Sequence, residues 1–268
     1  MRTFRFFCPE LDRERPELPA DELPHIRKVL RLKPGQEVEL FDGRGRSCAA
    51  RLVTVERRKV VCERLARPVA DPPPTLAIEV LTPLPKGRRA VWLIEKLSEL
   101  GVVSWRPLQT EHSEWDPAGF PRERPALERR ALEAAKQCRR NALLRIGEPI
   151  SPAELDFAPG AALFGAVDPA GDGPSPALPR SADGRWTILV GPEGGLTAAE
   201  EAALQAKGAR PFHLPTPVLR LETAALALTA ALLALTSAGA AGRLSSESDR
   251  LGHSDPERGA PDDPVDGL

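Results

Sequence analysis

The spacing of apolar and polar residues changes character near residue 70. Residues 37–41 alternate with period two, and residues 48–55 and 59–65 are further candidate strands. From residue 75 onwards, short apolar runs alternate with stretches of helical spacing. The pattern predicts a small β-barrel over residues 1–70, followed by an α/β domain with a mostly parallel sheet.

Residues 66–74 form the clearest linker of the chain. Three successive prolines at 72–74 exclude a helix and favour a stiff, extended spacer. We therefore expect a boundary here, with one domain over residues 1–70 and a second over residues 71–240.

The second region begins with a strand–helix–strand pattern. We expect a short apolar strand over residues 76–81, a helix over 91–100 and another strand over 102–108. A charged helix over 121–140 and a buried strand over 161–167 follow. This alternation of strands and helices is the basis for predicting a parallel sheet.

The last regular element that we expect is a helix from Thr223 to about Ser237. It is apolar nearly all round, with leucines among many alanines, so it must be buried in a core or against another subunit. Residues 241–268 lack periodicity and are rich in Gly, Ser, Pro and Asp. We interpret them as a disordered tail.

The most informative stretch is residues 187–200. Apolar residues predict a buried strand, a glycine-rich loop follows at 191–195, and Thr197 with Glu200 forms a capping box that opens a helix. Backbone N–H groups at such a loop can meet a ligand. The loop lacks the Lys and Ser/Thr of a phosphate-binding loop, and Glu193 places negative charge where a phosphate would sit. A neutral or cationic ligand fits better; an ordinary turn whose glycines only relieve backbone strain is the alternative.

A second segment strengthens the interpretation of this loop as a binding site. Residues 214–225 read Leu-Pro-Thr-Pro-Val-Leu-Arg-Leu-Glu-Thr-Ala-Ala. The Gly-Pro-Glu-Gly-Gly loop and this Leu-Arg-x-Glu-Thr-Ala motif together resemble the SPOUT methyltransferases. They resemble in particular the RsmE family, which methylates N3 of a uridine in 16S ribosomal RNA with S-adenosylmethionine. The resemblance runs over nearly the whole chain up to about residue 240.

The resemblance implies an architecture and partners that the residue pattern alone does not. The N-terminal region resembles the PUA-like RNA-binding domain of that family. The second domain is expected to contain a SPOUT-type trefoil knot, and the protein is expected to be a homodimer whose second subunit completes the site. The implied cofactor is S-adenosylmethionine, and the implied partner is 16S rRNA in the small ribosomal subunit.

By resemblance, two loops hold the cofactor: the glycine-rich loop and the segment before the last helix. The residues implied are Leu189, Gly191, Pro192, Glu193, Gly194, Gly195, Leu214, Val218, Leu219, Arg220, Thr223 and Ala224. Pro215 and Pro217 stand where the family more often has a glycine and an arginine. Pro215 removes a backbone donor, so we expect a stiffer loop with one contact fewer.

The chemistry of uracil N3 requires two catalytic groups. N3 carries a proton at neutral pH, so the reaction needs a base, together with a cation that stabilises charge on the ring oxygens. Arg220 and Glu222 are the nearest candidates in sequence. We assign Arg220 as the cation, and Glu222 as the base or as the group that orients Arg220. Both residues also fit a purely structural role at the start of the helix beginning at Thr223.

Candidate RNA contacts come from three basic segments. Arg27, Lys28 and Arg31 surround apolar residues at helical spacing, and Lys86 lies in a basic loop. Gln137 and Arg140 belong to a Glu-Ala-Ala-x-Gln-x-x-Arg motif that resembles one in the family and shares a helix face. Solvated, salt-bridged faces are the alternative for each segment.

One residue departs from the family pattern. His112 stands where we expect an arginine. If that arginine helps to hold RNA, its role is weakened in this chain or taken by a neighbouring residue.

Charge is unevenly distributed along the chain. Residues 1–150 carry 29 Lys+Arg against 22 Asp+Glu, whereas residues 151–240 carry 5 against 9 and residues 241–268 carry 3 against 7. The basic front half suits RNA phosphates. Solvated arginine-rich faces explain the charge alone equally well.

The remaining composition indicates a cytoplasmic protein without a metal. Cys8, Cys48, Cys62 and Cys138 are scattered, with no C-x-x-C pair and no histidine at ligand spacing, so we expect no metal site and a reducing compartment. No signal peptide is visible, and the longest apolar run, 224–235, is too short to cross a bilayer.

Three other functions are compatible with parts of the sequence. A SPOUT enzyme that methylates ribose 2′-hydroxyls shares the cofactor loops. A non-catalytic RNA-binding protein on the same scaffold is compatible with Pro215 and Pro217. An unrelated nucleotide-binding α/β enzyme fits less well, because the sequence contains no phosphate cradle.

Overall fold

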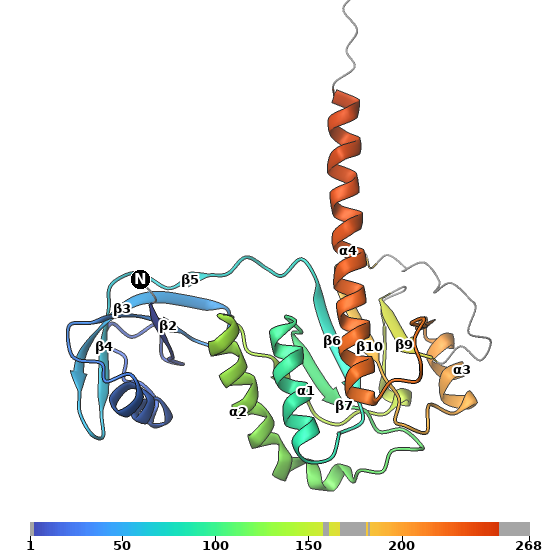
Figure 1. The fold of residues 1–268 in the computed structure, drawn as a ribbon, viewed down its shortest axis with the longest axis horizontal. Coiled ribbons are helices and arrows are strands. Elements are labelled where there is room, and N and C mark those ends of the chain that lie inside the picture. The colour runs from blue at the N-terminus through green and yellow to red at the C-terminus, as the bar shows by residue number, and fades with distance from the viewer. Residues whose placement is uncertain (1–2, 158–160, 167–180, 182, 252–268) are drawn as a thin grey trace, which may run out of the picture. The chain divides into compact units, whose positions relative to one another are not determined.

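The structure is a computed structural model that describes residues 3–157, 161–166, 181 and 183–251. The chain divides into two compact units, Met1–Ala230 and Ala231–Leu268. The first unit contains both sheets (Figure 1) and every residue of the site described below.

The N-terminal sheet has five strands within the described part of the chain. They are β1 (Phe4–Phe7), β2 (Glu37–Phe41), β3 (Arg46–Val55), β4 (Val60–Arg64) and β5 (Val69–Ala70). The order is β1-β2-β3-β4 with β5 paired to β3, and β1 runs parallel to β2 while the other pairs are antiparallel. Cys48, Ala50 and Leu52 of β3 are buried at every second position, because one face of this sheet covers the core. The strands predicted within residues 37–65 are confirmed.

Two local predictions for this domain need correction. The expected linker contains a strand, because β5 pairs with Arg46 and Ser47 of β3. The basic helix expected at 25–33 is shorter: it is a π-helix, His25–Val29, in which the Leu30 N–H donates to the His25 carbonyl (3.0 Å). Val29 is therefore 69% exposed, whereas Ile26 is buried as expected. Single 3-10 turns lie at Ala20–Glu22, Pro117–Gly119 and Pro152–Glu154.

The second sheet is entirely parallel in the described residues. Its strands are β6 (Ala77–Thr82), β7 (Ser104–Pro107), β8 (Arg145–Ile146), β9 (Ala162–Gly165), β10 (Arg185–Leu189) and β11 (Arg210–Phe212), in the order β11-β9-β10-β6-β7-β8. The helices are α1 (Arg88–Glu99), α2 (Phe120–Cys138), α3 (Ala198–Ala206) and α4 (Leu221–Leu251). The predicted α/β class with a parallel sheet is confirmed.

The strand order sets the position of the functional loops. The chain builds outward from β6 to β7 and β8 on one side, and β10, β9 and β11 lie on the other side. The loops after parallel strands leave from one edge of a sheet, and ligands of such folds bind where the order reverses. Here that point is the β6–β10 pair, and α1 begins just after β6, beside α2 (Figure 1).

Helix α4 starts earlier and extends further than expected. It begins at Leu221 rather than Thr223 and continues to Leu251, so residues 241–251 are helical where we expected a disordered tail. Arg243, Leu244 and Glu247 are good helix formers, and they outweigh the glycines. Residues 252–268 of the expected tail lie outside the described residues. Within the described ranges, no helix is both long and apolar enough to span a membrane.

A tight turn at Asp42 joins the two domains of the first unit. The buried Asp42 carboxylate accepts hydrogen bonds from the Arg44 N–H (2.8 Å), the Arg46 N–H (3.0 Å) and Arg46 Nε (2.7 Å). Gly43 follows with φ +75°, and its carbonyl accepts from the Leu143 N–H (3.0 Å). Asp42 therefore fixes the turn through which the N-terminal sheet contacts the segment after α2.

We expect Asp42→Asn to lower the free energy of unfolding by about 1–3 kcal/mol, because buried donors lose a charged acceptor. Burial opposes ionisation of Asp42, but the hydrogen bonds from Arg46 and Arg44 outweigh it and lower its pKa below the ordinary 3.8. The stability that Asp42 contributes is therefore present above that value and lost as pH falls through the lower, folded-state pKa. Urea unfolding at several acidic pH values measures both effects; identical pH dependence in the two proteins would contradict the prediction.

Candidate functional site

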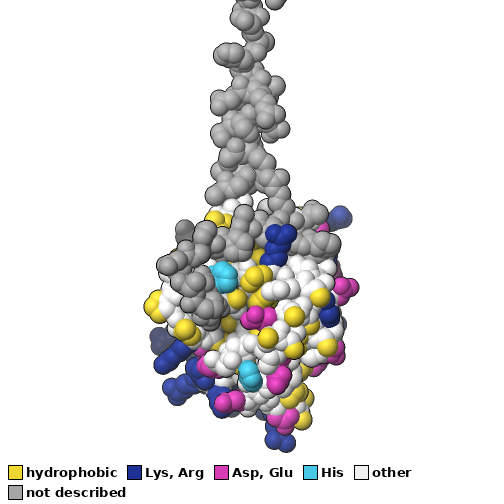
Figure 2. Space-filling view, turned by 90° about the vertical axis from the view of Figure 1, so that its right-hand side faces the viewer, with side chains coloured by type: hydrophobic (Ala, Val, Ile, Leu, Met, Phe, Trp, Pro, Cys, Tyr) yellow, Lys and Arg dark blue, Asp and Glu magenta, His cyan; other side chains and the backbone are white. Residues whose placement is uncertain are grey.

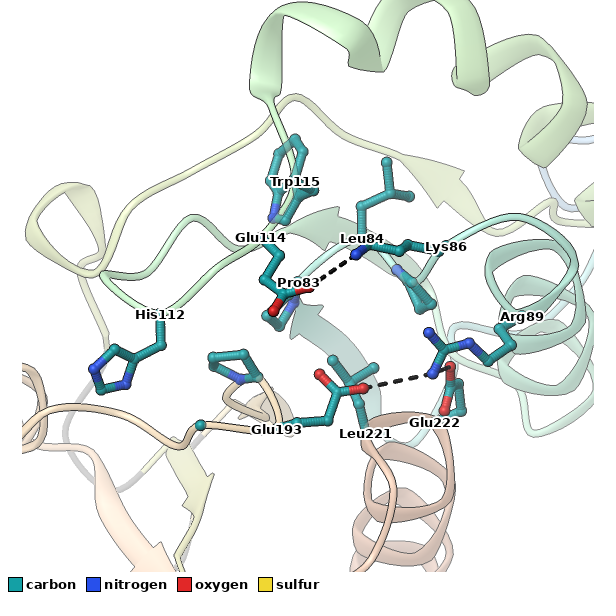
Figure 3. A pocket seen from close by; sticks show the side chains of 13 residues that line it. Pro83, Leu84, Lys86, Arg89, His112, Glu114, Trp115, Glu193, Leu221 and Glu222 are labelled. Carbon is teal, nitrogen blue, oxygen red and sulfur yellow. Dashed lines mark hydrogen bonds and ion pairs between the residues drawn. The ribbon is translucent and has the colours of Figure 1, made fainter.

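Three loops and two helix starts surround a cavity of about 220 Å³ at the ends of β6 and β10 (Figure 3). The loop after β6 contributes residues 83–86, and the first turn of α1 contributes Arg89. The remaining lining comes from the loop after β7, the glycine-rich loop after β10 and the first turn of α4, namely His112, Glu114, Trp115, Pro192, Glu193, Gly194, Leu221 and Glu222. Parallel pairing of the central strands therefore brings together segments that are far apart in the sequence.

Charged groups dominate the rim of this cavity. Arg89 Nη1 lies 3.5 Å from Glu193 Oε1 and 3.4 Å from Glu222 Oε1, and Figure 3 shows Arg89 reaching toward both carboxylates. Lys86 Nζ lies 2.8 Å from Glu114 Oε2. Glu222 is only 4% exposed, and no described residue forms a hydrogen bond with its Oε1. The cavity thus contains a buried carboxylate oxygen that can still accept a hydrogen bond.

The glycine-rich loop packs closely against the loop after β7. A Cβ at Gly194 would lie 3.3 Å from His112 Cβ, and Gly195 adopts φ +73°. His112 Nδ1 is 3.2 Å from the Gly195 carbonyl oxygen. A side chain at Gly194 would crowd His112 and one at Gly195 would strain the backbone, so the glycines allow the two loops to pack closely.

One carboxylate links this loop to the start of α3. The predicted capping box is confirmed: Thr197 Oγ1 accepts from the Glu200 N–H (3.2 Å), and Glu200 Oε2 accepts from the Thr197 N–H (2.9 Å). Glu200 Oε1 also accepts from the Glu111 N–H (2.9 Å). Glu200 therefore connects the loop after β7 to the end of the glycine-rich loop after β10.

Two family models match most of the chain. An RNA methyltransferase domain matches residues 72–233, and an RNA methyltransferase PUA domain matches residues 18–63. Ribosomal RNA small subunit methyltransferase E (RsmE) from Mycobacterium bovis is 31% identical over 212 residues, which are 76% of this chain and 80% of that protein. The chain belongs to the RsmE family. The predicted family membership and the predicted N-terminal PUA domain are confirmed.

Two further RsmE proteins extend the comparison. The Bacillus subtilis protein is 27% identical over 216 residues, covering 76% of this chain and 84% of that relative. The crystal structure of the Neisseria gonorrhoeae protein bound to S-adenosyl methionine has a TM-score of 0.75 at 28% identity, covering 87% of this chain and 98% of that one. The similarity therefore includes both domains of the RsmE fold.

The cavity includes only part of the cofactor site predicted from RsmE. Pro192, Glu193 and Gly194 line it. The other predicted cofactor residues are outside the lining: Leu189 is buried in β10, Gly191 and Gly195 flank the lining residues, Leu214, Val218 and Leu219 follow β11, and Thr223 and Ala224 belong to the first turn of α4. Val218 is 80% exposed. The structure thus separates the predicted residues into three that line the cavity and others, of varied burial, that do not.

The two predicted catalytic residues differ in their surroundings. Glu222 is buried in the cavity, whereas Arg220 is exposed and does not line it. The charged neighbour of Glu222 is Arg89, so of the two predicted roles for Glu222 the structure lacks the contact with Arg220 that orienting it would need. The helix start explains this, because side chains two positions apart point in different directions.

The predicted RNA contacts also divide into exposed and structural residues. Lys28, Arg31 and Gln137 are exposed, Arg27 is half-buried, and Lys86 lines the cavity. Arg140 instead donates from Nη1 to the carbonyls of Ser98 (2.7 Å) and Val102 (3.0 Å), and burial lowers the pKa of Arg140. It does not share a face with Gln137, because α2 ends at Cys138 and Arg139 turns to φ 62°.

Sequence reasoning missed Arg89, Glu114 and Trp115 as lining residues. Arg89 belongs to the recognised basic loop, but nothing in the sequence distinguishes it from its neighbour Arg88. Trp115 Nε1 donates to the Leu108 carbonyl (3.3 Å), a contact that depends on the fold.

The described cysteines and acidic residues offer no metal centre. Among the described residues, no group of three or more His, Cys, Asp or Glu side chains could hold a metal ion. Burial raises the pKa of Cys8 to about 11 and that of Cys62 to about 12, so these thiols stay protonated and unreactive at neutral pH.

Figure 2 shows the side of the molecule that faces right in Figure 1, where α3 lies. Apolar and acidic side chains are intermixed on this face, and most of the visible Lys and Arg side chains gather toward one edge. The picture agrees with the acidic balance of residues 151–240.

We expect Glu200→Ala to lower the free energy of unfolding by about 1–2 kcal/mol, the usual contribution of a helix cap. Amide hydrogen exchange at Glu111 should also become faster, because its acceptor is lost. Glu201→Ala is the matched control, since no described N–H donates to the Glu201 carboxylate. Equal exchange at Glu111 in both variants would show that Glu200 does not hold the loop after β7.

Proposed function

We propose that this protein transfers a methyl group from S-adenosylmethionine to N3 of a uridine in 16S rRNA of the small ribosomal subunit. The observation that carries the proposal is the buried Glu222 carboxylate of the cavity lining, whose Oε1 accepts no hydrogen bond from the described residues. Membership of the RsmE family and the cofactor-bound Neisseria relative support the same reaction.

The residues around the glycine-rich loop suit this cofactor. Gly194 lets the loop pack closely against His112, and the exposed Glu193 carboxylate beside Arg89 adds negative charge that suits a positively charged group. We propose that the cofactor residues predicted by resemblance within 189–195 and 214–224 hold the cofactor. When bound, S-adenosylmethionine supplies a methyl group on a positively charged sulfur that leaves as a neutral thioether, so no acid is required.

Glu222 and Arg220 divide the remaining chemistry. We propose that the Glu222 carboxylate takes the proton from uracil N3, which makes N3 a nucleophile. Arg220 precedes the two α4 residues that line the cavity, and its exposed guanidinium is available to the charge that develops on the uracil oxygens. The Leu221 side chain is buried and anchors the start of α4, so Glu222 is held at the cavity.

We further propose the domain boundaries, the knot and the homodimer. A boundary between residues 70 and 71 is supported by the end of β5 at Ala70 and by the family matches over 18–63 and 72–233. The homodimer follows from the resemblance to the SPOUT enzymes. The knot follows from the resemblance of the cofactor loops to SPOUT enzymes.

Methyl transfer tests the function directly. Wild-type protein is incubated with labelled S-adenosylmethionine and small ribosomal subunits that lack the modification, and the digested RNA is analysed. We expect the wild-type product to be N3-methyluridine. The rate of methyl transfer should fall about 100-fold in Glu222→Gln and in Arg220→Ala, the usual range for lost acid–base or charge-stabilising groups. Cofactor titration confirms that each variant still binds its ligand.

Each alternative has its own outcome in this experiment. A 2′-O-methylated product would identify a ribose methyltransferase. Cofactor binding without transfer would identify a silent scaffold or a different substrate. Full turnover in Arg220→Ala would remove Arg220 from the catalytic assignment.

The exposed basic turn of the PUA domain is the proposed RNA contact. We expect Lys28→Glu and Arg31→Glu to weaken rRNA binding and to reduce the slope of log affinity against log salt by about 1 for each lost phosphate contact. Arg13→Glu is the control, because Arg13 is also exposed in the same domain but its Nη1 lies 2.9 Å from Glu10 Oε2. Equal losses in all three variants would mean that net charge, not this turn, governs binding.

A further inference from the structure

We propose that Arg89 is a positioning residue for the reaction, because its guanidinium holds the buried Glu222 carboxylate in place for proton transfer. The inference rests on the proposed function and adds a residue from a different part of the chain. Arg89 acts through Glu222 and is not itself assigned a contact with the substrate.

The geometry joins three separate elements at one atom. Arg89 Nη1 of α1 lies 3.4 Å from Glu222 Oε1 of α4 and 3.5 Å from Glu193 Oε1 of the glycine-rich loop. Arg89 therefore connects the proposed base to the loop that is proposed to hold the cofactor. A shift of either segment relative to the other would stretch this contact, so Arg89 sets their spacing.

Burial makes the contact with Glu222 the more important of the two. The Glu222 side chain is 6% exposed, whereas that of Glu193 is 66% exposed. A buried carboxylate needs a charge partner, and Arg89 is the one that the described residues supply. Water can replace Arg89 at Glu193 but not at Glu222.

The contact also leaves Glu222 able to react. At 3.4 Å the ion pair is longer than a good hydrogen bond, and Oε1 accepts no hydrogen bond from the described residues. Charge is therefore balanced while Oε1 keeps an unused capacity to accept a hydrogen bond. A direct, short hydrogen bond from Arg89 would occupy the same oxygen.

The other cations near the cavity lack this arrangement. Lys86 pairs with Glu114, and both side chains are largely exposed, at 68% and 81%. Arg88 is exposed, and no described carboxylate pairs with it. Arg88 and Arg89 are adjacent in the first turn of α1, so the fold alone distinguishes their roles.

Steady-state methyl transfer with Arg89→Gln, and with Arg88→Gln as the matched control, tests the proposal. We expect kcat to fall about 10- to 100-fold in Arg89→Gln, because a misplaced catalytic group costs a factor of this order, while the KM for S-adenosylmethionine changes less than about twofold. Arg88→Gln removes the same charge from the same helix turn and should retain wild-type kcat. Arg89→Lys keeps the charge and should recover part of the loss.

The double variant Arg89→Gln with Glu222→Gln shows whether Arg89 acts by positioning Glu222 or acts independently of Glu222. If Arg89 acts through Glu222, the double variant is no slower than Glu222→Gln alone. The proposal would be overturned if the kcat losses of the two single variants multiplied in the double variant. It would also be overturned if Arg89→Gln changed only KM or kept the wild-type kcat. Should Arg89→Gln fail to fold, as judged by its thermal transition, Arg89→Lys carries the same comparison. Wild-type protein that transfers no methyl group would instead reject the proposed function.

Discussion

The parallel pairing of β6 with β10 is the constraint on which the site depends. Residues 77–81 lie beside residues 185–189, although residues 82–184 separate them in the sequence. Because both strands run in one direction, their following loops leave from the same edge. The first turn of α1 and the glycine-rich loop thereby become neighbours, and the first turn of α4 closes the cavity between them. This pairing is what brings Arg89 close to both Glu193 and Glu222.

Burial decides which of the charged contacts at this edge matter. The exposed pair of Lys86 and Glu114 belongs to a class that contributes about 0–1 kcal/mol, because water screens it. The pair of Arg89 and Glu222 combines a half-exposed cation with a buried carboxylate, and breaking such pairs costs more, up to about 3–5 kcal/mol when both partners are buried. Charge and distance alone would therefore favour the Lys86–Glu114 pair, although the buried Glu222 makes the Arg89–Glu222 pair the stronger candidate.

The two domains of the first unit have different physical tasks. The PUA domain presents Lys28 and Arg31 to solvent without ion pairs to described residues, which suits a mobile polyanion. The methyltransferase domain instead pairs its cavity cations with carboxylates, which suits ordered chemistry in a confined space. The Asp42 turn connects these tasks, since it fixes the N-terminal sheet to the segment that follows α2.

Sequence by itself determined the features that depend on neighbours along the chain. Period-two alternation identified the N-terminal strands, Thr197 and Glu200 identified the start of α3, and two local motifs identified the RsmE family. Tertiary structure decided what depends on distant residues. It removed Arg140 from the α2 face by turning the chain at Arg139, and it placed Arg89 rather than Arg220 beside Glu222. The physical reason is that periodicity and capping act over a few residues, whereas the partner of a buried charge is set by strand order and by the direction in which each helix begins.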